Sequence, residues 1–456
     1  MSKNVTKNFI DSLQSLVNIE PSEVDCKQVS RCLIDYLGAT LSGVKLLKGK
    51  TEHLSQLMEH GAGAVCPIGS SNKVSLETAA LINGLNSHEA EMDDGIRFGM
   101  VHPGAPLFSA LLPVAQVFGV QRIDFVRGVL IGYEATIRLA RAVQPSHYRR
   151  GHHPTATCGA IGAAMGIAAM LKFDAKEMEN TLGAVSLAVA GSLKVVDDGS
   201  ELKPYNVGRA AALAIQSSMV GKAGFATPPD VLNGSTGFFA MTTDQVDLAC
   251  LAEQSPSNYW IHHIYVKPYA ACRHAHPSIE GAIALLKEQR FHILDIKRVT
   301  IYTYHGLKGR HDNQGVTCPS SARMSIPFSV AIALSTCKAG IVEFATDSVS
   351  DPIIKELSTK VFVEEEQAYT DLVPNRRPAK ICVELKNGQR FSREVIYAKG
   401  EPENPLTDKE LENKYIELAL FAGVSSTYSQ NLLEKVWEMP ENLDMLFDAI
   451  KKCTPV

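Results

Sequence analysis

Histidines gather in three short windows of this 456-residue chain. Nine of the fourteen lie within residues 88–102, 147–153 and 262–276. The first window, HEAEMDDGIRFGMVHPGAP, places four carboxylates within six residues and follows them with His102 in a Gly- and Pro-rich turn. Because imidazole exchanges protons near neutral pH and carboxylates orient it, this pattern favours an acid/base site over scattered surface histidines.

The acidic stretch itself admits three interpretations. His88, Glu91 and Asp94 are spaced by three, so they are expected to share a face at the end of a helix over 76–94, with Asp93 beside them. A polar helix end would give the same pattern, and His and carboxylates at this spacing can also ligate zinc or iron. Since no H-E-x-x-H or C-x-x-C accompanies the stretch, we predict a metal-free acid/base site.

The second window, SHYRRGHHPTATCGAIGAA, places Tyr148 and His153 just before a helix for which Thr155 is the expected cap. The helix dipole opposes protonation of a histidine at a helix N-terminus. His153 is therefore expected to stay neutral and able to take up a proton. Simple capping of the helix is the alternative role of His153.

Two further segments set basic residues at the start of a helix. In ELKPYNVGRAAALA they are Lys203 and Arg209, and in YVKPYAACRHAHPSIEGA they are Lys267, Arg273, His274 and His276. The free N–H groups of a helix N-terminus bind carboxylate or phosphate. A solvated lysine is the commoner explanation for one such segment, but two basic helix entrances favour an anion-binding site.

These segments together predict an anionic substrate that is held by cations and processed by proton transfer. We expect Lys203, Lys267 and Arg273 to hold it, with His102 and His153 moving protons. The combination suits proton abstraction next to a carboxylate, where the difficulty is the doubly charged enolate and nearby cations stabilise it. No cofactor is required, and the sequence contains no Rossmann fingerprint, P-loop or G-x-S-x-G elbow.

Up to about residue 250 the apolar residues recur with a helical period. Pro21 and Ser22 open a helix that stops near Gly38 or Gly43. Further helices are expected at 76–94, 106–119, 123–143, 155–172, 175–193 and 206–223. The small residues of TATCGAIGAAMGIAAML allow close approach of neighbouring helices, as in the middle of a bundle. This part of the chain is predicted to be all-α.

After about residue 260 the pattern changes to strand-like alternation. IKRVTIYTY and AKICVELKNGQRFSREVIYA alternate as strands do, and Asn387 with Gly388 forms a hairpin turn in the second segment. Helices are expected near 277–289, 320–337 and 351–361, and Thr407 with Glu410 caps a later helix. We therefore predict a mostly α fold, with a large all-α helical domain to which roughly the last fifty residues return, and a smaller α+β domain.

The composition is that of an ordinary globular protein. Hydrophobic residues make up 45% and charged residues 21%, and 45 Lys and Arg against 49 Asp and Glu give a net charge of −4. No basic field exists to attract nucleic acid or an anionic membrane surface, and no segment has the pattern of a signal peptide or a membrane span. Ten cysteines without a C-x-x-C fit free thiols, so a cytoplasmic protein is expected.

The four chemistry-bearing segments, in this order and at these separations, resemble the MmgE/PrpD family, which includes 2-methylcitrate dehydratase, cis-aconitate decarboxylase and iminodisuccinate epimerase. The strings that carry the resemblance are LINGLNSHEAEMDDG, HPGAPLFSALLPVA, GHHPTATCGAIGAA, LKPYNVGRAAALA, PPDVLNGSTGFF and KPYAACRHAHPSIEGA. The resemblance spans essentially the whole chain. It implies a helical domain over 1–265 and 400–456, an α+β lid domain over 266–399, a homodimer and chemistry without a cofactor.

Roles for individual residues follow from the resemblance together with the patterns above. Residues expected to be catalytic are His102, His153, Lys203 and Lys267. Residues expected to bind substrate are His88, Glu91, Asp93, Asp94, Tyr148, Cys272 and Arg273. The decarboxylase branch resembles this chain less closely at two positions, because it has a histidine at Cys272 and a tyrosine near Phe328. Both changes remove a proton donor, and Glu91 stands where the family usually has Asp.

These departures weaken the decarboxylase interpretation, whereas a dehydratase or an epimerase needs only a base, an acid and a carboxylate clamp. We predict a cofactor-free lyase or isomerase acting on a small di- or tricarboxylate by α-proton abstraction. A 2-methylcitrate dehydratase-like reaction is favoured, with an iminodisuccinate epimerase-like or cis-aconitate decarboxylase-like reaction as the alternative. Two alternatives of another class are a metal-dependent hydrolase built on the acidic stretch and His102, and a non-catalytic binder of polycarboxylates.

Overall fold

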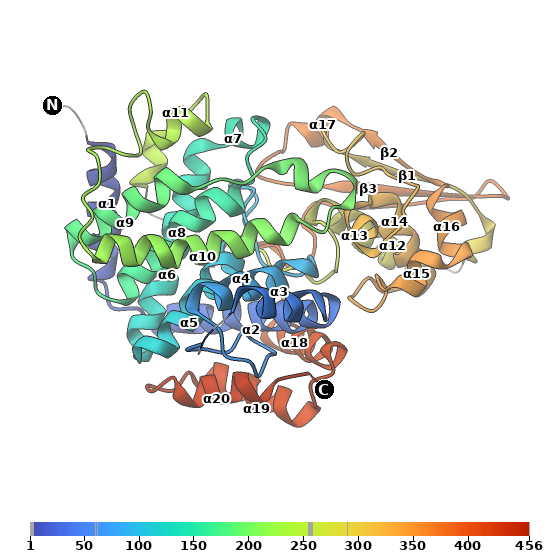
Figure 1. The fold of residues 1–456 in the computed structure, drawn as a ribbon. Coiled ribbons are helices and arrows are strands. Elements are labelled where there is room, and N and C mark those ends of the chain that lie inside the picture. Colours follow the sequence, from blue (N-terminus) through green and yellow to red (C-terminus); the bar gives the residue numbers. More distant parts are fainter. Residues whose placement is uncertain (1–3, 60, 62, 254–258, 290, 456) are drawn as a thin grey trace.

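The protein is mostly helical with one small mixed sheet (Figure 1). The computed structural model describes residues 4–455 except 60, 62, 254–258 and 290. The long helices gather on one side of the molecule, and the sheet with its short helices lies on the other side. Among the described residues no helix combines the length and the apolarity needed to cross a bilayer.

The helical part is built around one buried helix. Its longer elements are α1 (Val5–Val17), α2 (Glu23–Leu46), α3 (Lys50–Met58), α4 (Leu76–Glu89), α5 (Gly104–Phe118), α6 (Arg122–Val143), α8 (Pro154–Met170), α9 (Ala175–Ala188) and α10 (Lys203–Lys222). Its short elements are α7 (Ser146–Arg149), η1 (Leu193–Gly199), α11 (Phe238–Thr242), η2 (Leu248–Leu251) and η3 (Trp260–His263). Every residue of α8 is buried, and α8 packs against both α6 and α10.

Small residues allow this close packing, as the sequence predicts. A Cβ at Gly162 of α8 would lie 1.7 Å from Thr136 Oγ1 of α6, so any larger residue would push the two helices apart. The expected helix over 175–193 is too long, because α9 ends at Ala188 and the chain is extended at Val189 before it enters η1.

The sheet has four strands in the order β2-β1-β3-β4. They are β1 (Ile296–Thr303), β2 (Val361–Glu365), β3 (Ala379–Leu385) and β4 (Arg390–Val395). β1 is antiparallel to β3 and parallel to β2, and the predicted hairpin between β3 and β4 turns at Gly388, which has a φ of 87°. The sequence predicts β1, β3 and β4 but not β2.

Short helices cover this sheet, and we call residues 276–395 the sheet region. Its helical elements are α12 (His276–Glu288), η5 (Ile293–Asp295), α13 (Pro319–Met324), α14 (Ile326–Thr336), α15 (Thr346–Ser350), α16 (Pro352–Ser358) and α17 (Gln367–Thr370), with η4 (Arg273–Ala275) just before it. The single helix expected at 320–337 is two helices, because Ser325 is extended and its Oγ caps α14 by accepting from Phe328 N. The helix expected at 351–361 ends at Ser358, and Val361 already belongs to β2.

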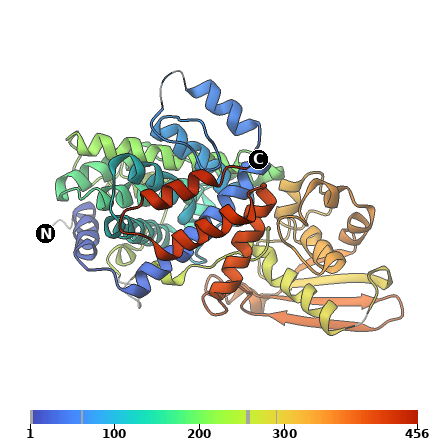
Figure 2. The ribbon, with the colours of Figure 1, turned by 90° about the horizontal axis from the view of Figure 1, so that it is seen from below.

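The C-terminal helices pack on the helical part. They are α18 (Asp408–Ala422), α19 (Ser426–Glu438) and α20 (Asp444–Lys452), and α18 and α19 contact α2 (Figure 2). Thr407 and Glu410 form the predicted capping box. Apolar residues of these helices share one buried cluster with those of α5, α6 and α8, while a second cluster surrounds the sheet. The expected domain boundaries stay a prediction.

Candidate active site

The acidic stretch is a turn rather than a helix end. Helix α4 stops at Glu89, and Glu91 has a φ of 54°, a left-handed conformation that does not continue the helix. The expected common helical face of His88, Glu91 and Asp94 is therefore wrong, since only His88 lies on the helix. Beyond the turn, Gly95 pairs with Tyr265 through two backbone hydrogen bonds, and this pairing fixes the start of the loop that carries His102.

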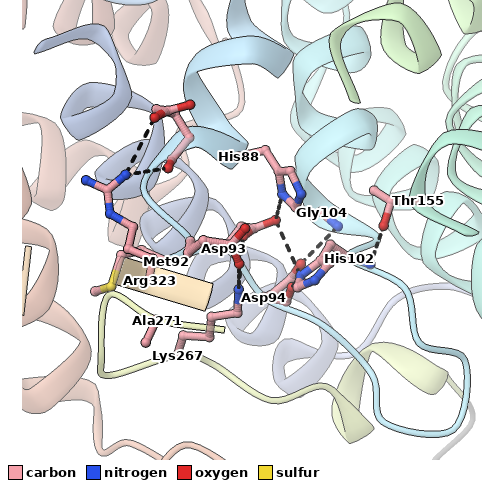
Figure 3. Close-up of polar contacts among 12 residues, drawn as sticks. His88, Met92, Asp93, Asp94, His102, Gly104, Thr155, Lys267, Ala271 and Arg323 are labelled. Carbon is pink, nitrogen blue, oxygen red and sulfur yellow. Dashed lines mark hydrogen bonds and ion pairs between the residues drawn. The ribbon is translucent and has the colours of Figure 1, made fainter. Parts of the chain in front are cut away.

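Asp93 joins the two histidines of this segment (Figure 3). Its Oδ2 lies 2.6 Å from His88 Nδ1 and 3.4 Å from His102 Nδ1, and the two rings are 5.1 Å apart. Burial opposes ionisation of Asp93, but His102, His88 and Lys267 together hold the pKa of this carboxyl below its ordinary value. One buried carboxylate thus orients two imidazoles.

Asp94 fixes the backbone around His102. Its carboxylate accepts from Tyr133 OH at 2.5 Å and from Gly104 N at 3.1 Å, and its carbonyl oxygen accepts from His102 Nδ1 at 2.5 Å. Burial raises the pKa of Asp94 to about 7. The N–H of His102 also donates to Thr155 Oγ1 at 3.2 Å, so Thr155 supports this turn and lies inside α8 rather than capping it.

Two lysines balance the acidic turn. Lys203, the first residue of α10, forms an ion pair with Glu91, and Lys267 Nζ lies 3.1 Å from Glu91 Oε2 and 3.5 Å from Asp93 Oδ1. Burial would raise the pKa of Glu91, but Lys203 and Lys267 hold it well below its ordinary value. Burial would lower the pKa of Lys267, but Glu91 and Asp93 raise it above its ordinary value. The carboxylates are therefore neutralised by protein cations.

His153 completes a group of three imidazoles. It is the residue before α8, its ring lies 6.1 Å from that of His88, and its Nδ1 is 3.3 Å from Asn206 Nδ2. Burial first, and then the neighbouring His88 and Lys203, hold the pKa of His153 well below its ordinary value. The expected neutral state is supported, but burial rather than the helix dipole is the main cause.

The hydrogen bonds assign different tautomers to these imidazoles. His102 Nδ1 faces a carbonyl oxygen, so it carries the proton and Nε2 has a free lone pair. His88 Nδ1 likewise donates to Asp93. In contrast, Asn206 Nδ2 donates to Ser192 O at 3.2 Å and to His153 Nδ1, so the proton of neutral His153 lies on Nε2. His102 therefore offers a proton acceptor at Nε2, and His153 offers a proton donor at Nε2.

Of these groups His88 lines a small pocket between the helical part and the sheet region, whereas His102 and His153 are not among the described residues that line it. Lining residues from the helical part include His88, Glu89, Glu91 and Lys203, and those from α13 are Ser320, Arg323 and Met324. His88 Nε2 is buried and has no hydrogen-bond partner among the described residues. The pocket suits a small polar ligand.

Arg323 and Glu89 are pocket residues that the sequence analysis does not find. Arg323 is 1% exposed, and its Nη1 donates to Glu89 O at 3.1 Å. The available signal is a lone arginine within the small and apolar run SSARMSIPFSVAIAL, because a charge in such a run is expected to be buried and paired.

Three residues that the sequence predicts to bind substrate, Tyr148, Cys272 and Arg273, are not among the described residues that line the pocket. Arg273 forms an ion pair with Glu401, which also accepts from Arg97 Nη1 at 2.7 Å. Burial raises the pKa of the Cys272 thiol and of Tyr148. The contact of these three residues with substrate stays a prediction.

Among the described residues, one group of side chains has the spacing to hold a metal ion, and it lies outside the acidic turn. Ligand atoms of Cys272, His274 and His311 all lie within 4.8 Å of one another. His274 Nδ1 contacts Tyr304 OH, and His311 Nδ1 donates to Met324 O at 3.0 Å. Burial, and then neighbouring cations, lower the pKa of His274 well below its ordinary value, and the same positive field would oppose a divalent cation.

Comparison with known proteins identifies the class to which this fold and site belong. The model of the MmgE/PrpD N-terminal domain matches residues 16–251, and that of the MmgE/PrpD C-terminal domain matches residues 269–439. The chain is a member of the MmgE/PrpD family, as its sequence motifs predict.

Three curated relatives match most of the chain, and two of them match nearly all of it. Cis-aconitate decarboxylase of Mus musculus is 22% identical over 480 residues, covering 98% of this chain and 92% of the relative. The Homo sapiens enzyme of the same name is 22% identical over 488 residues, covering 98% and 94%. Cis-aconitate decarboxylase-like protein oryM of Aspergillus oryzae is 22% identical over 381 residues, covering 77% of each chain.

Proposed function

We propose that this protein is a cofactor-free lyase that removes a proton from the carbon next to a carboxylate of a small di- or tricarboxylate. The observation that carries the proposal is the group of three imidazoles, in which His102 and His153 are held in complementary tautomers and His88 lines a pocket together with Lys203. A proton donor, His153, and a proton acceptor, His102, are then both present while both imidazoles are neutral. Membership of a family whose named relatives are decarboxylases agrees with a lyase.

His102 is the base in this proposal. Burial lowers the pKa of His102 to about 3, so its Nε2 lone pair is available at neutral pH. As the proton moves to Nε2, the imidazolium that forms lies 3.4 Å from Asp93 Oδ2, which stabilises it. His88, which Asp93 also holds, lines the pocket, and its Nε2 is buried without a hydrogen-bond partner among the described residues.

His153 supplies the donor. Its Nε2–H can bond the oxygen that leaves the β carbon, so that the hydroxyl departs as water while the electron pair of the broken C–H bond forms the alkene. Lys203 stabilises the negative charge of the enolate before the alkene forms. Lys203 is paired with Glu91 at rest, so a substrate carboxylate must share or replace that partner.

Dehydration of a 2-methylcitrate-like substrate is the reaction we favour. Phe328 is fully buried and has no hydroxyl, and Cys272 is a protonated thiol whose pKa burial raises, at the two places where the resemblance implies proton donors in decarboxylases. Decarboxylation of a cis-aconitate-like substrate is the second candidate, because cis-aconitate decarboxylases are among the curated relatives.

Proton exchange in D₂O tests the shared first step. The enzyme would be incubated with citrate, 2-methylcitrate, cis-aconitate or iminodisuccinate, and the α-proton signals followed by ¹H NMR. Exchange with a rising alkene absorbance supports dehydration, release of CO₂ supports decarboxylation, and exchange with inversion alone supports epimerisation. Binding of these acids with neither exchange nor product would contradict the proposal and favour a non-catalytic binder.

A further inference from the structure

The pocket contains a buried cation with unused hydrogen-bond donors. Arg323 is 1% exposed, and its Nε and Nη2 atoms are buried without hydrogen-bond partners in the part of the chain that the structure describes. Its Nη1 donates to Glu89 O, and Glu89 Oε1 lies 3.5 Å away, too far for a strong bond. The N–H donors of a buried guanidinium normally form hydrogen bonds, so the two donors of Arg323 without acceptors need an explanation.

A planar anion is the ligand that these donors fit. Guanidinium binds a carboxylate through two parallel N–H···O bonds, which lysine cannot do. Nε and Nη2 lie on one edge of the guanidinium, and both are the free atoms here. Arg323 lines the same pocket as His88 and Lys203, but it comes from α13 of the sheet region, whereas those two residues come from the helical part.

Arg273, the expected arginine of the clamp, fits this role less well. Its Nη1 also has no partner among the described residues, but its Nη2 is engaged by Glu401, which also holds Arg97, and Arg273 is not among the described residues that line the pocket. Arg323 has only the longer contact with the Glu89 carboxylate. Burial raises the pKa of Glu89, and Arg323 partly offsets this by lowering it. A carboxylate entering the pocket therefore competes with a weaker partner at Arg323 than at Arg273.

We propose that Arg323 binds one carboxylate of the substrate through Nε and Nη2, while Lys203 interacts with another, so that the pocket selects acids with at least two carboxylates. This inference deepens the proposed function and rests on it for the position of the reacting carbon between the two cations. It also makes α13 part of the ligand site, because Arg323 is the pocket cation that the sheet region contributes among the described lining residues.

The test compares acids that differ by a single carboxylate. Affinities for butyrate, succinate and tricarballylate would be measured by NMR titration with the full chain, its Arg323→Met and Arg323→Lys variants, and Arg390→Met. Arg390 is a matched control, since its side chain is 77% exposed and its partner Glu384 lies on the sheet outside the pocket. Arg323→Met should weaken succinate and tricarballylate binding by roughly 10- to 100-fold and weaken butyrate binding by less, because a monocarboxylate loses one of two alternative sites whereas a dicarboxylate loses simultaneous binding to both cations.

The Lys variant covers the case in which Arg323→Met does not fold. Arg323→Lys keeps the charge but loses the fork, so succinate binding should weaken by about 3- to 10-fold relative to Arg390→Met. Equal losses for butyrate and succinate, or no loss in either variant, would overturn the inference. If selectivity between butyrate and succinate depends on Arg323 but no acid shows α-proton exchange, the proposed function is refuted and this inference stands. If α-proton exchange occurs and Arg323→Lys leaves the selectivity unchanged, this inference is refuted and the proposed function stands.

Discussion

Replacement of Asp93 by asparagine tests whether the carboxylate that joins His88 and His102 takes part in the proton transfer. The amide has nearly the same shape but carries no charge, and it can donate to a histidine Nδ1 as well as accept from it. Asp93 is not among the described residues that line the pocket, so binding of substrate should change little. The expected effect is therefore a loss of kcat with KM within a few fold.

The size of the loss follows from the geometry. A full positive charge on His102 at 3.4 Å from Asp93 Oδ2 would be stabilised by about 5 kcal/mol at an effective dielectric constant of about 20. With the charge half developed in the transition state the stabilisation is about half of that. Asp93→Asn should thus lower kcat by roughly 50- to 4,000-fold.

The assay is α-proton exchange or turnover per folded molecule, with unfolding followed by circular dichroism. Lys267 keeps its contact with Glu91 in the variant, so a stability loss of about 1–3 kcal/mol is expected. Glu134→Gln is the matched control, because Glu134 is equally buried and pairs with Arg138 at 3.2 Å on a helix outside the pocket. It should lose stability but keep kcat. A kcat of Asp93→Asn within threefold of the wild type would refute the proposed role of Asp93.

Other predictions follow from the same geometry. His102→Ala and His153→Ala should each lower kcat by roughly 100-fold or more with native circular dichroism. Lys203→Ala should lower kcat/KM by about 2–4 kcal/mol, with partial rescue in Lys203→Arg, measured by steady-state kinetics. Lys267→Ala should also destabilise the fold by about 3–5 kcal/mol in denaturant titration, because it leaves buried carboxylates short of a partner. Turnover should survive prolonged chelation, since lysines neutralise the acidic turn; recovery only on adding a divalent metal would contradict this. Burial lowers the pKa of His147 from 6.5 to about 4, so the unfolded chain binds more protons between these values and stability is lost as pH falls through this window. His147→Gln should remove about 3 kcal/mol of that pH dependence, measured as the free energy of unfolding at pH 7.5 and 4.

Local sequence patterns predict most elements of the fold but not those set by distant contacts. The helical period and the small residues of α8 predict a buried central helix, and the alternation and the Asn387-Gly388 turn predict the β3–β4 hairpin. β2 is missed because a strand of five residues shortly after a helix gives little periodicity, and its strand form depends on parallel pairing with β1, in which Val361 lies opposite Val299. The end of α4 is missed because glutamate rarely adopts a positive φ, so the sequence gives no signal that Glu91 does so.

The candidate site divides in the same way, between groups whose spacing indicates chemistry and groups that only folding brings together. Clustered histidines and basic helix starts point to the imidazoles and Lys203, whereas Arg323 is 234 residues from its partner Glu89 and belongs to no motif. Sequence charge also does not reveal which cation faces which anion. Lys267 carries the charge expected of a substrate clamp, yet it is fully buried against Glu91 and Asp93. With Lys203 already paired with Glu91, an incoming polycarboxylate gains most where a cation still has free donors, and in this pocket those donors are on Arg323.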